Sequence, residues 1–439
     1  MQDISYDFIT KINNNYKRNK YNKIIENAIK NVSLNSFCLD SSVINETVNI
    51  FNIELPKSKI YNQGSSERCW IYAGINLIKN NIAQNLNIDE ENFALSANYL
   101  AFLDKLEKAN TIYNRIIENN KFDFEKEIKK DYLKYGVYEG GYFEYFRSLV
   151  KKYGLVPETV MPDVKNSKNP NSLINLLNDK VKKDVFKLIK LKKENSSFNN
   201  LMEIKDKMLD ENYNILAKCL GELPLNFDFE YKNKNNEYVK LKNLTPLDFA
   251  NRYLTIDLNN FVGIANVPMF NKKYNCFYRK EFAESIYNNS YVEFINLPIE
   301  ILKNLAIKQL KNGLPVYFGC AMRKMTNNDL GIMDSNLYNY KDIFNIELLT
   351  KSEALSMYDI DFQHLMLLTG VHIEDNKIIR WKVEDSYGDQ VHKNGYYIMN
   401  DNFFDDFVLE VIIDKKYLSE EQREILKQKP ILFDLSEPF

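Results

Sequence analysis

The 439-residue sequence has few cysteines and no long apolar run. Its five cysteines are widely spaced and form no Cys-x-x-Cys pair, which argues against a disulfide framework and a structural zinc site. No window approaches the roughly 18 consecutive apolar residues of a membrane-spanning helix, and the polar N-terminus has no secretory signal pattern. These absences predict a soluble intracellular protein, and no sequence motif indicates a metal or other cofactor.

Charge of one sign is also lacking, because the formal net charge is only −2. A near-neutral chain has no general attraction to nucleic acids or anionic membranes. The lysine-rich segment 180–193 is a candidate for nucleic-acid binding, but Val185, Leu188 and Leu191 recur in it at helical spacing. That pattern is typical of an ordinary helix with a solvated charged face, so nucleic-acid binding is not expected. The glycine pair of YEGGY (138–142) is no Gly-rich phosphate loop.

Histidine is scarcer still, with His364, His372 and His392 as its three occurrences. Any mechanism that uses histidine must draw on one of them. His364 opens an apolar run and is expected at the start of a strand, where it is the best candidate for a catalytic base. His372 precedes a turn, and His392 lies in a polar loop, so we expect both to be structural or exposed.

Apolar periodicity predicts two halves of different character. The first ~300 residues are mostly of helical pattern, and the part after about residue 316 is rich in strands. The polar segment 163–250 is expected to be an inserted, loop-rich arm, and a solvated tail is expected after Lys415. The predicted strands are 316–322, 364–373, 378–385, 395–400 and 407–414.

The stretch NQGSSERCWI (62–71) places a cysteine directly before an apolar stripe of helical spacing. That stripe consists of Ile71, Ile75, Ile78 and Ile82, and it predicts a helix that begins at or just before Cys69 behind Ser65 and Ser66. A cysteine there lies in the positive end of the helix dipole, which favours the reactive thiolate. Cys69 is therefore a candidate nucleophile; the alternative is an inert buried thiol.

The segment IIRWKVED (378–385) predicts a strand whose inward face ends in a carboxylate. Ile379, Trp381, Val383 and Asp385 share one face of that strand. An unpaired buried charge costs several kcal/mol, so Asp385 needs a partner unless it tilts into the solvated turn that follows. His364 is the natural partner if the turn at 374–376 lays the two strands side by side.

A nucleophile on a helix end, a base on a strand and an orienting group on the next strand follow the logic of an activated thiol. The side-chain amide of Gln63, together with the backbone N–H of Cys69, can then donate to a developing oxyanion.

These residues resemble the active-site motifs of papain-like cysteine peptidases. QGSSERCW (63–70) resembles the glutamine and nucleophile of that family, and EDSYG (384–388) resembles its Asn-Ser-Trp-Gly signature. The chain is most similar to the branch formed by bleomycin hydrolase and bacterial aminopeptidase C. The likeness covers nearly the whole chain and includes segments 93–110, 138–162, 245–253, 305–322, 361–371 and 381–388.

The resemblance implies an α+β, papain-like fold with a helical half, a β-rich half and large insertions. It also implies a cytosolic aminopeptidase that needs no metal and assembles as a homohexamer around a central cavity. The implied organisation is an N-terminal helical arm (1–58), a helical half with the nucleophile helix (59–162), an inserted arm of helices and loops used in oligomerisation (163–250), the remaining core with His364 and Asp385 (251–415), and a tail in or near the cleft (416–439).

The resemblance further implies a role for each candidate residue. Cys69 would be the nucleophile, His364 the base, Asp385 its orienting group and Gln63 the oxyanion donor. Gly140 and Gly141 resemble a contact with the substrate backbone, and the terminal carboxylate of Phe439 would engage the free amine of a peptide. The predicted function is removal of N-terminal residues from peptides through a thioester acyl-enzyme.

Three residues depart from the family pattern. Asp385 stands where the family has asparagine, Tyr387 where it has tryptophan, and Glu67 where it usually has glycine. Asp385 keeps an acceptor for histidine and adds negative charge, which favours an imidazolium. Glu67 either crowds the cleft or contacts a substrate's amine. Because the departures cluster at one site, the alternative function is an inactive relative that acts as a binding or scaffolding hexamer.

Overall fold

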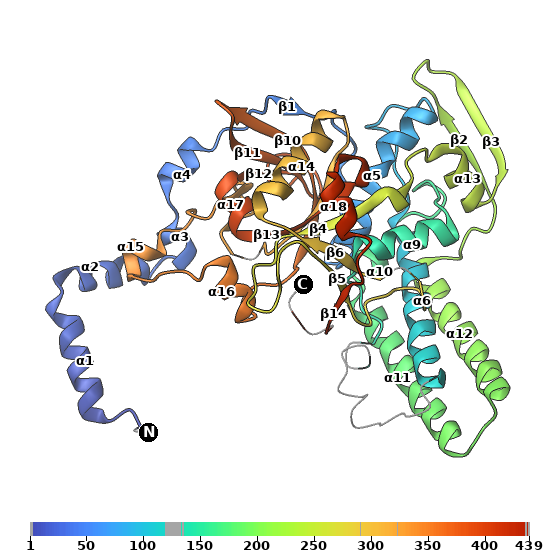
Figure 1. Ribbon diagram of the computed structural model, residues 1–439, viewed down its shortest axis with the longest axis horizontal. Helices are drawn as coiled ribbons and strands as arrows, with labels where there is room; N and C mark the ends of the chain where they lie inside the picture. Colours follow the sequence, from blue (N-terminus) through green and yellow to red (C-terminus); the bar gives the residue numbers. More distant parts are fainter. Residues whose placement is uncertain are drawn as a thin grey trace.

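The computed structural model describes residues 3–118, 133, 136–289, 291–322, 324–434 and 437. A helical arm at the N-terminus projects from a larger body, in which a sheet lies beside a group of long helices (Figure 1). The arm contains α1 (Tyr6–Arg18), α2 (Lys20–Ile29), α3 (Leu34–Cys38) and α4 (Ser41–Glu46). None of the helices in the described part of the chain is apolar and long enough to cross a membrane.

The helical half of the body is built around α5 (Cys69–Asn85), which is buried along most of its length. It packs against α6 (Ala97–Glu118), α9 (Phe143–Tyr153) and α13 (Pro246–Tyr253). The predicted start of the nucleophile helix is confirmed, since α5 begins at Cys69. Ser65 and Ser66 do not cap it; the N-cap residue is Arg68, and its side chain makes no capping bond.

Segment 163–250, predicted as an arm of helices and many loops, contains more regular structure than expected. Its elements are α10 (Lys165–Lys168), α11 (Asn171–Lys193), α12 (Phe198–Leu220), and a hairpin of β2 (Phe227–Lys232) and β3 (Tyr238–Leu244). Both long helices pack on α6, and Val185 and Leu188 of the expected stripe are buried. Only one face of each helix needs to be apolar, so the apolar stripe is narrow. The many lysines and asparagines on the other faces make that stripe difficult to recognise in the sequence.

The β-rich half is a single 12-stranded sheet with the order β14-β5-β6-β4-β13-β7-β10-β11-β12-β9-β8, and β1 pairs with β10. The five predicted strands are present as β7 (Val316–Cys320), β10 (His364–Glu374), β11 (Lys377–Glu384), β12 (Tyr396–Asn400) and β13 (Val408–Asp414). The remaining strands are β1 (Ile53–Glu54), β4 (Phe261–Ala265), β5 (Cys276–Lys280), β6 (Glu293–Asn296), β8 (Thr326–Asn327), β9 (Ile332–Met333) and β14 (Ile431–Phe433).

Strands β4 to β6 were not predicted, although most of the regular structure in the first ~300 residues is helical, as expected. Each strand has only four or five residues, and β5 (CFYRK) and β6 (EFIN) also contain charged residues. Runs of that length do not reveal their period, so their strand character comes from pairing with β13 and with each other.

The sheet separates two apolar cores, because side chains alternate between its faces. Leu365 and Leu367 of β10 join the core that contains α5. Met366 and Leu368 join the opposite core, which contains α14 (Ile299–Lys311). Smaller helices complete this half: α15 (Tyr340–Phe344), α16 (Lys351–Ser356), α17 (Asp401–Phe407), and the 3-10 helix η1 (Leu258–Asn260).

The hairpin of β10 and β11 brings two candidate residues to one end of the sheet. The strands are antiparallel, and Asp375 and Asn376 turn the chain with φ of +48° and +63°. Such a two-residue turn matches the twist of the strands that it joins. His364 begins β10 and Asp385 directly follows β11, so the predicted side-by-side arrangement is confirmed.

The expectation of a solvated tail after Lys415 is wrong for the described part of that segment. The chain forms η2 (Lys415–Tyr417) and α18 (Glu420–Ile425), and β14 then pairs in parallel with β5. Phe433 is buried in a core with Tyr278 and Phe294, and this burial ties the segment to the body. Phe439 lies outside the described residues.

Candidate active site

A cleft with a volume of about 1050 Å³ lies between the two halves. Its lining includes residues of 63–69 and 138–142 from the helical half. The facing side is lined by residues of 326–329 and 361–365 and by Tyr387. Of the residues predicted from the sequence, this cleft brings together Gln63, Cys69, Gly140, Gly141 and His364.

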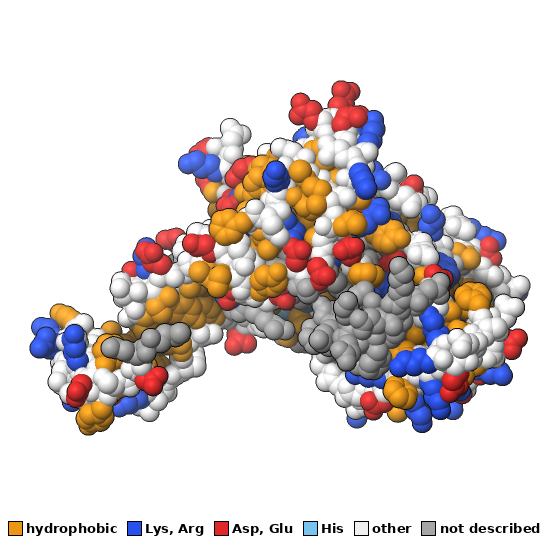
Figure 2. Space-filling model, turned by 60° about the horizontal axis from the view of Figure 1, so that its bottom comes forward, with side chains coloured by type: hydrophobic (Ala, Val, Ile, Leu, Met, Phe, Trp, Pro, Cys, Tyr) orange, Lys and Arg blue, Asp and Glu red, His pale blue; other side chains and the backbone are white. Residues whose placement is uncertain are grey.

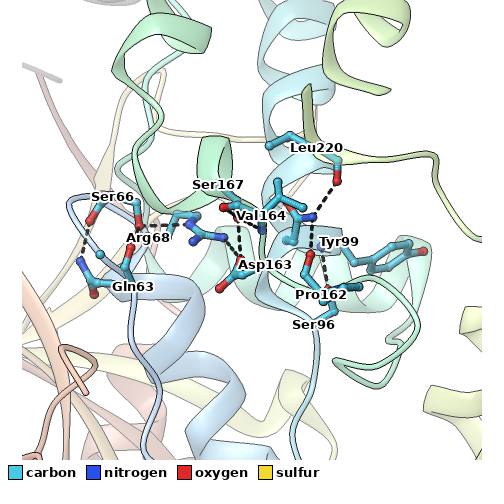
Figure 3. Close-up of polar contacts among 12 residues, drawn as sticks. Gln63, Ser66, Arg68, Ser96, Tyr99, Pro162, Asp163, Val164, Ser167 and Leu220 are labelled. Atoms are coloured by element: carbon cyan, nitrogen blue, oxygen red, sulfur yellow. Dashed lines mark hydrogen bonds and ion pairs between the residues drawn. The ribbon is translucent and has the colours of Figure 1, made fainter. Parts of the chain in front are cut away.

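Cys69 is the first residue of α5, and its exposed fraction is 8%. The loop before it is held by a buried ion pair that the sequence did not reveal. Arg68 pairs with Asp163 at 2.8 Å, and its Nε donates to Ser66 Oγ at 3.1 Å (Figure 3). Tyr72 donates to the other oxygen of Asp163. Breaking a buried pair leaves an uncompensated charge, so this pair fixes the loop that presents the thiol.

Gln63 is buried between the two halves and is held by both of them. Ser386 Oγ donates to Gln63 Oε1 at 2.6 Å, and the Gln63 backbone N–H donates to the Ser386 carbonyl at 2.7 Å. Gln63 Nε2 donates to the Ser66 carbonyl at 2.5 Å (Figure 3). These contacts orient the amide with its nitrogen toward the loop that carries Cys69.

The two glycines have different local environments. A Cβ on Gly141 would lie 2.5 Å from the ring of Trp70, so close packing alone requires glycine there. A Cβ on Gly140 would meet only the ring of Tyr138, at ordinary contact distance. Trp70 itself donates to the Glu139 carbonyl at 2.7 Å, which ties this loop to α5.

His364 and Asp385 form the predicted pair, with Nε2 and Oδ1 2.9 Å apart. Both side chains are buried, and Asp385 is only 1% exposed, so it does not tilt into the solvated turn. The Ser386 backbone N–H also donates to Asp385 Oδ1, at 2.7 Å. Because Nε2 of His364 faces the carboxylate, its Nδ1 is left for Cys69, with which the ring also interacts.

Electrostatics favour the charged form of this pair. Burial alone would lower the pKa of His364, but the Asp385 charge and the hydrogen bonds to Asp385 and Cys69 raise it to about 10. Burial likewise opposes ionisation of Asp385, yet His364 and the donors around it hold the pKa of this carboxyl well below its ordinary value. The two shifts agree, and both describe an imidazolium beside a carboxylate.

Tyr387 covers one face of His364. The two rings are stacked, with centroids 5.6 Å apart and planes inclined by 20°. Tyr387 is 38% exposed, so it stands between the solvent and the buried His364–Asp385 contact.

His392 corrects the prediction of an exposed loop residue. Its side chain is only 3% exposed, and Nε2 lies 3.2 Å from Asp385 Oδ2. Its Nδ1 lies 2.9 Å from the carbonyl oxygen of Asn328. The sequence carried one signal for this contact, which is that His392 follows Asp385 by seven residues in a chain with three histidines. Its burial depends on the distant Asn328 loop, which no local pattern reveals.

Charges on the cleft wall are acidic. Glu67, Asp329 and Asp361 are exposed lining residues, and the described lining residues include neither lysine nor arginine. Glu67 is anchored by its backbone N–H, which donates to Glu139 Oε2 at 3.1 Å. Among the described residues, no group of three or more His, Cys, Asp or Glu is arranged to hold a metal ion.

Comparison with known proteins matches residues 3–439 to the Peptidase C1-like family. Aminopeptidase C of Listeria monocytogenes is 34% identical over 383 residues, covering 87% of this chain and 86% of that protein. Aminopeptidase G of Lactobacillus delbrueckii subsp. lactis is 32% identical, covering 95% and 94%. The crystal structure of PepW from Lactobacillus rhamnosis superimposes with a TM-score of 0.94 at 33% identity, covering 99% of this chain and 98% of that one.

The protein therefore belongs to the Peptidase C1-like family. The predicted family and the predicted α+β, papain-like fold are confirmed. The predicted class of enzyme, a cysteine-type aminopeptidase, is supported by the family and by these relatives.

Proposed function

We propose that this cysteine-type aminopeptidase removes N-terminal residues from peptides with Cys69 as its nucleophile and His364 as its acid and base. The observation that carries the assignment is the buried His364–Asp385 pair beside a cysteine at the start of a helix. A cysteine so placed has the helix dipole and an imidazolium to stabilise its thiolate. Asp385 orients the His364 ring through Nε2 and leaves Nδ1 for the reaction.

The reaction follows from this geometry in two halves. Cys69 Sγ attacks the carbonyl carbon of the first peptide bond, and the charge on oxygen is taken up by the Cys69 backbone N–H and the second N–H of the Gln63 amide. His364 gives its Nδ1 proton to the leaving amine, the C–N bond breaks, and a thioester remains. Water then attacks the thioester while His364 accepts its proton, which releases the amino acid and restores the thiolate–imidazolium pair.

The preference for a free N-terminus is assigned to negative charge in the cleft. Glu67, Asp329 and Asp361 line it, and a protonated amine is their natural counter-charge. The C-terminal segment is a second source of negative charge for the substrate's free amine. Glu437 pairs with Lys272 at 2.5 Å, and its carbonyl accepts from Lys280, which also donates to Tyr142 of the cleft wall.

Two residues beyond Glu437 can span roughly 7 Å. We assign to the Phe439 carboxylate the contact with the amine, and to Gly140 a contact with the substrate backbone.

Fluorogenic aminoacyl amides, free and N-acetylated, test the proposal on the wild type and on Cys69→Ala. Release from free amines only, lost in Cys69→Ala and kept in Cys219→Ala, is the expected result. Cys219 is a matched control because it is a free cysteine on α12. Retained hydrolysis in Cys69→Ala would refute the assignment. Silence of the folded wild type across the panel would favour the alternative, an inactive binding or scaffolding relative.

Removal of residues 435–439 tests the assigned source of exopeptidase specificity. Without the terminal carboxylate, hydrolysis of free aminoacyl amides should fall and N-acetylated substrates should become acceptable. An unchanged preference for free amines would assign the specificity to the acidic lining instead, and Glu67→Gln would then be the variant to measure.

A homohexamer is the proposed assembly, and its support is the N-terminal arm. Helices α1 and α2, which lie wholly within the described residues, bury none of their side chains in this chain. Figure 2 shows the arm standing clear of the body with hydrophobic side chains on its surface. Its exposed apolar residues include Phe8, Ile9, Ile12, Tyr21 and Ile24. Such a surface is normally covered by a partner.

Light scattering on the full chain and on residues 33–439 tests the assembly. A hexamer that dissociates on removal of the arm is expected, and a monomeric full chain would refute it. We also place the protein in the cytosol, where its five free cysteines would remain reduced.

A further inference from the structure

The buried side chain of His392 has no part in the reaction derived above, yet it contacts the site. Its Nε2 lies 3.2 Å from Asp385 Oδ2, the carboxylate oxygen that does not face His364. Asp385 thus lies between two histidine rings, one on each oxygen. The carboxylate is almost fully buried, so both of its oxygens need donors.

The partners of His392 define where its protons are. A carbonyl oxygen only accepts hydrogen bonds, so Nδ1, which faces the Asn328 carbonyl at 2.9 Å, carries a hydrogen. A carboxylate also only accepts, so Nε2 carries a hydrogen as long as Asp385 is ionised. Both acceptors can receive a hydrogen bond at the same time only when the His392 ring is an imidazolium.

Charge along the site then alternates in sign. The sequence is the Cys69 thiolate, the His364 imidazolium, the Asp385 carboxylate and the His392 imidazolium, and the four charges sum to zero. Without the last of them, a buried site would hold a net negative charge, which is costly away from water. The extra charge would also bind the His364 proton more tightly and make His364 a weaker acid toward the leaving amine.

The surroundings hold His392 in this position. Its backbone adopts φ of +56°, a conformation that L-residues rarely occupy and that the rest of the loop must enforce. Its ring stacks on Tyr397, with centroids 3.9 Å apart. The Tyr397 hydroxyl donates to the side chain of Asn328 at 2.9 Å, so the residue that accepts from His392 is itself fixed.

We propose that His392 is a positioning residue for the reaction, which donates as an imidazolium to the second oxygen of Asp385 and balances the charge that this carboxylate places beside His364. The inference rests on the roles proposed above for Cys69, His364 and Asp385. It predicts that Asp385 and His392 depend on each other: the charge of Asp385 needs His392 for its balance, and His392 contributes to kcat/KM only while that charge is present.

A double-mutant cycle tests this dependence. His392→Phe keeps a ring against Tyr397 but removes the charge and the donors, and we expect kcat/KM to fall about ten- to a hundredfold. In an Asp385→Asn background the same change should cost less than about threefold. The asparagine oxygen still accepts from His364, and its amide can donate to a neutral His392, so no charge remains to be balanced. His372→Phe is the matched control, because His372 lies near the far end of β10 and should leave kcat/KM unchanged.

An equal loss in both backgrounds would overturn the proposal, because it would mean that His392 only supports the loop. Thermal unfolding of each variant checks the fold. If His392→Phe does not fold, His392→Gln replaces it, since glutamine retains a donor but not the charge. We expect His392→Gln, too, to lower kcat/KM more in the presence of Asp385 than in the Asp385→Asn background.

The pH dependence of Cys69 alkylation by iodoacetamide gives a second readout that needs no substrate. The rate changes where His364 loses its proton, near pH 10 in the wild type. His392→Phe removes the donor to Asp385 Oδ2 and leaves more negative charge on the carboxylate beside His364, so this transition should move to higher pH. Loss of the negative charge in Asp385→Asn should move it to lower pH. An unmoved transition in His392→Phe would refute the proposal.

Two of the titratable groups that face the His364 and His392 rings are excluded as the origin of the transition. Besides Cys69 and Asp385, the titratable side chains facing them are Cys320 on β7, Tyr397 on β12 and Tyr387, and Lys393 follows His392 in the chain. Burial raises the pKa of both Cys320 and Tyr397 well above the ordinary values, so these two stay neutral through the range. Alkylation is followed on the Cys69 peptide by mass spectrometry, with Cys69→Ala as the blank. If the wild type hydrolyses no aminoacyl amide, the proposed function fails, while the alkylation experiment still decides the role of His392.

Discussion

The two walls of the cleft both contain buried charges but use them differently. On the helical wall, Arg68 pairs with Asp163 and Lys105 pairs with Glu139, and neither pair touches the thiol. On the sheet wall, Asp385 contacts His364 and His392, and His364 lines the cleft together with Cys69, the proposed nucleophile. On one wall the charges hold a loop in place, and on the other they lie beside the histidine that we propose as acid and base.

The choice of cation explains the difference. Arginine stays protonated at every pH that a protein survives, so its ion pair holds the loop independently of pH. Histidine titrates near neutrality and responds strongly to a neighbouring carboxylate. Both walls contain a buried aspartate paired with a basic side chain. On the helical wall, here called the rigid wall, that side chain is Arg68; on the sheet wall, here called the titrating wall, it is His364.

The largest effect should come from the titrating wall. His364→Gln removes the proposed acid and base, and kcat/KM for aminoacyl amides should fall by about 10²–10⁴. Thermal unfolding measured alongside should change little, because the glutamine amide can still donate to Asp385. His372→Gln serves as the control, and a comparable loss of activity in it would break the contrast between the two histidines.

The rigid wall should respond in stability instead. Arg68→Met leaves Asp163 buried without its partner, and urea unfolding should show a loss of about 3–5 kcal/mol. The matched control is Lys59→Met, because Lys59 and Glu158 form an exposed pair with side chains 40% and 32% exposed. That change should cost no more than about 1 kcal/mol. Equal losses would show that the buried pair is no more important than a surface one.

Glu144 is a buried carboxyl without a close cation among the described residues, and it should make the unfolding free energy depend on pH. Burial, only partly offset by Arg147, raises the pKa of Glu144 from 4.5 to about 7. A carboxyl with a raised pKa stabilises the fold below its unfolded pKa and loses that contribution as pH rises. The unfolding free energy of the wild type should therefore fall between pH 4.5 and 7, by on the order of 2–3 kcal/mol.

Glu144→Gln should flatten that fall, as measured by urea titrations at several pH values. The neighbouring Glu410 has its pKa raised by burial and by Glu144, so it contributes a fall of the same sign, which Glu144→Gln leaves in part. A fall of unchanged size in Glu144→Gln would contradict the assignment.

The smallest effect should come from the contact that links the two walls. Ser386→Ala removes the donor to Gln63 Oε1, which is one of the two side-chain contacts that orient the amide that we assign to the oxyanion. Loss of one neutral hydrogen bond is worth about 1–1.5 kcal/mol, so kcat should fall about five- to tenfold with little change in KM. Ser65→Ala is the control, because Ser65 bonds only to the segment around Asn169. A larger effect in the control would place the important contact elsewhere.

Local pattern predicted those parts of the site that lie at element ends. The stripe after Cys69 gave the start of α5, and the alternation in 378–385 with its preceding turn gave the neighbouring positions of His364 and Asp385. Strands β4 to β6 were missed, because strands of four or five residues are ambiguous until they pair. Of the two long helices in segment 163–250, only the stripe of α11 was recognised, because a narrow apolar stripe is ambiguous until the helix packs. Arg68–Asp163 and Asp385–His392 were missed because each joins segments through a loop.

The sequence by itself determined the chemistry that is available: few cysteines, three histidines, a thiol before a helical stripe, and a carboxylate at the end of an inward-facing row. These are properties of composition and of periods of two or 3.6 residues, which a chain carries locally. Only the tertiary structure decided which groups share a proton. Burial removes water as a competing partner and lets His392 reach Asp385 from a loop, so the protonation of the site depends on neighbours that the sequence does not place side by side.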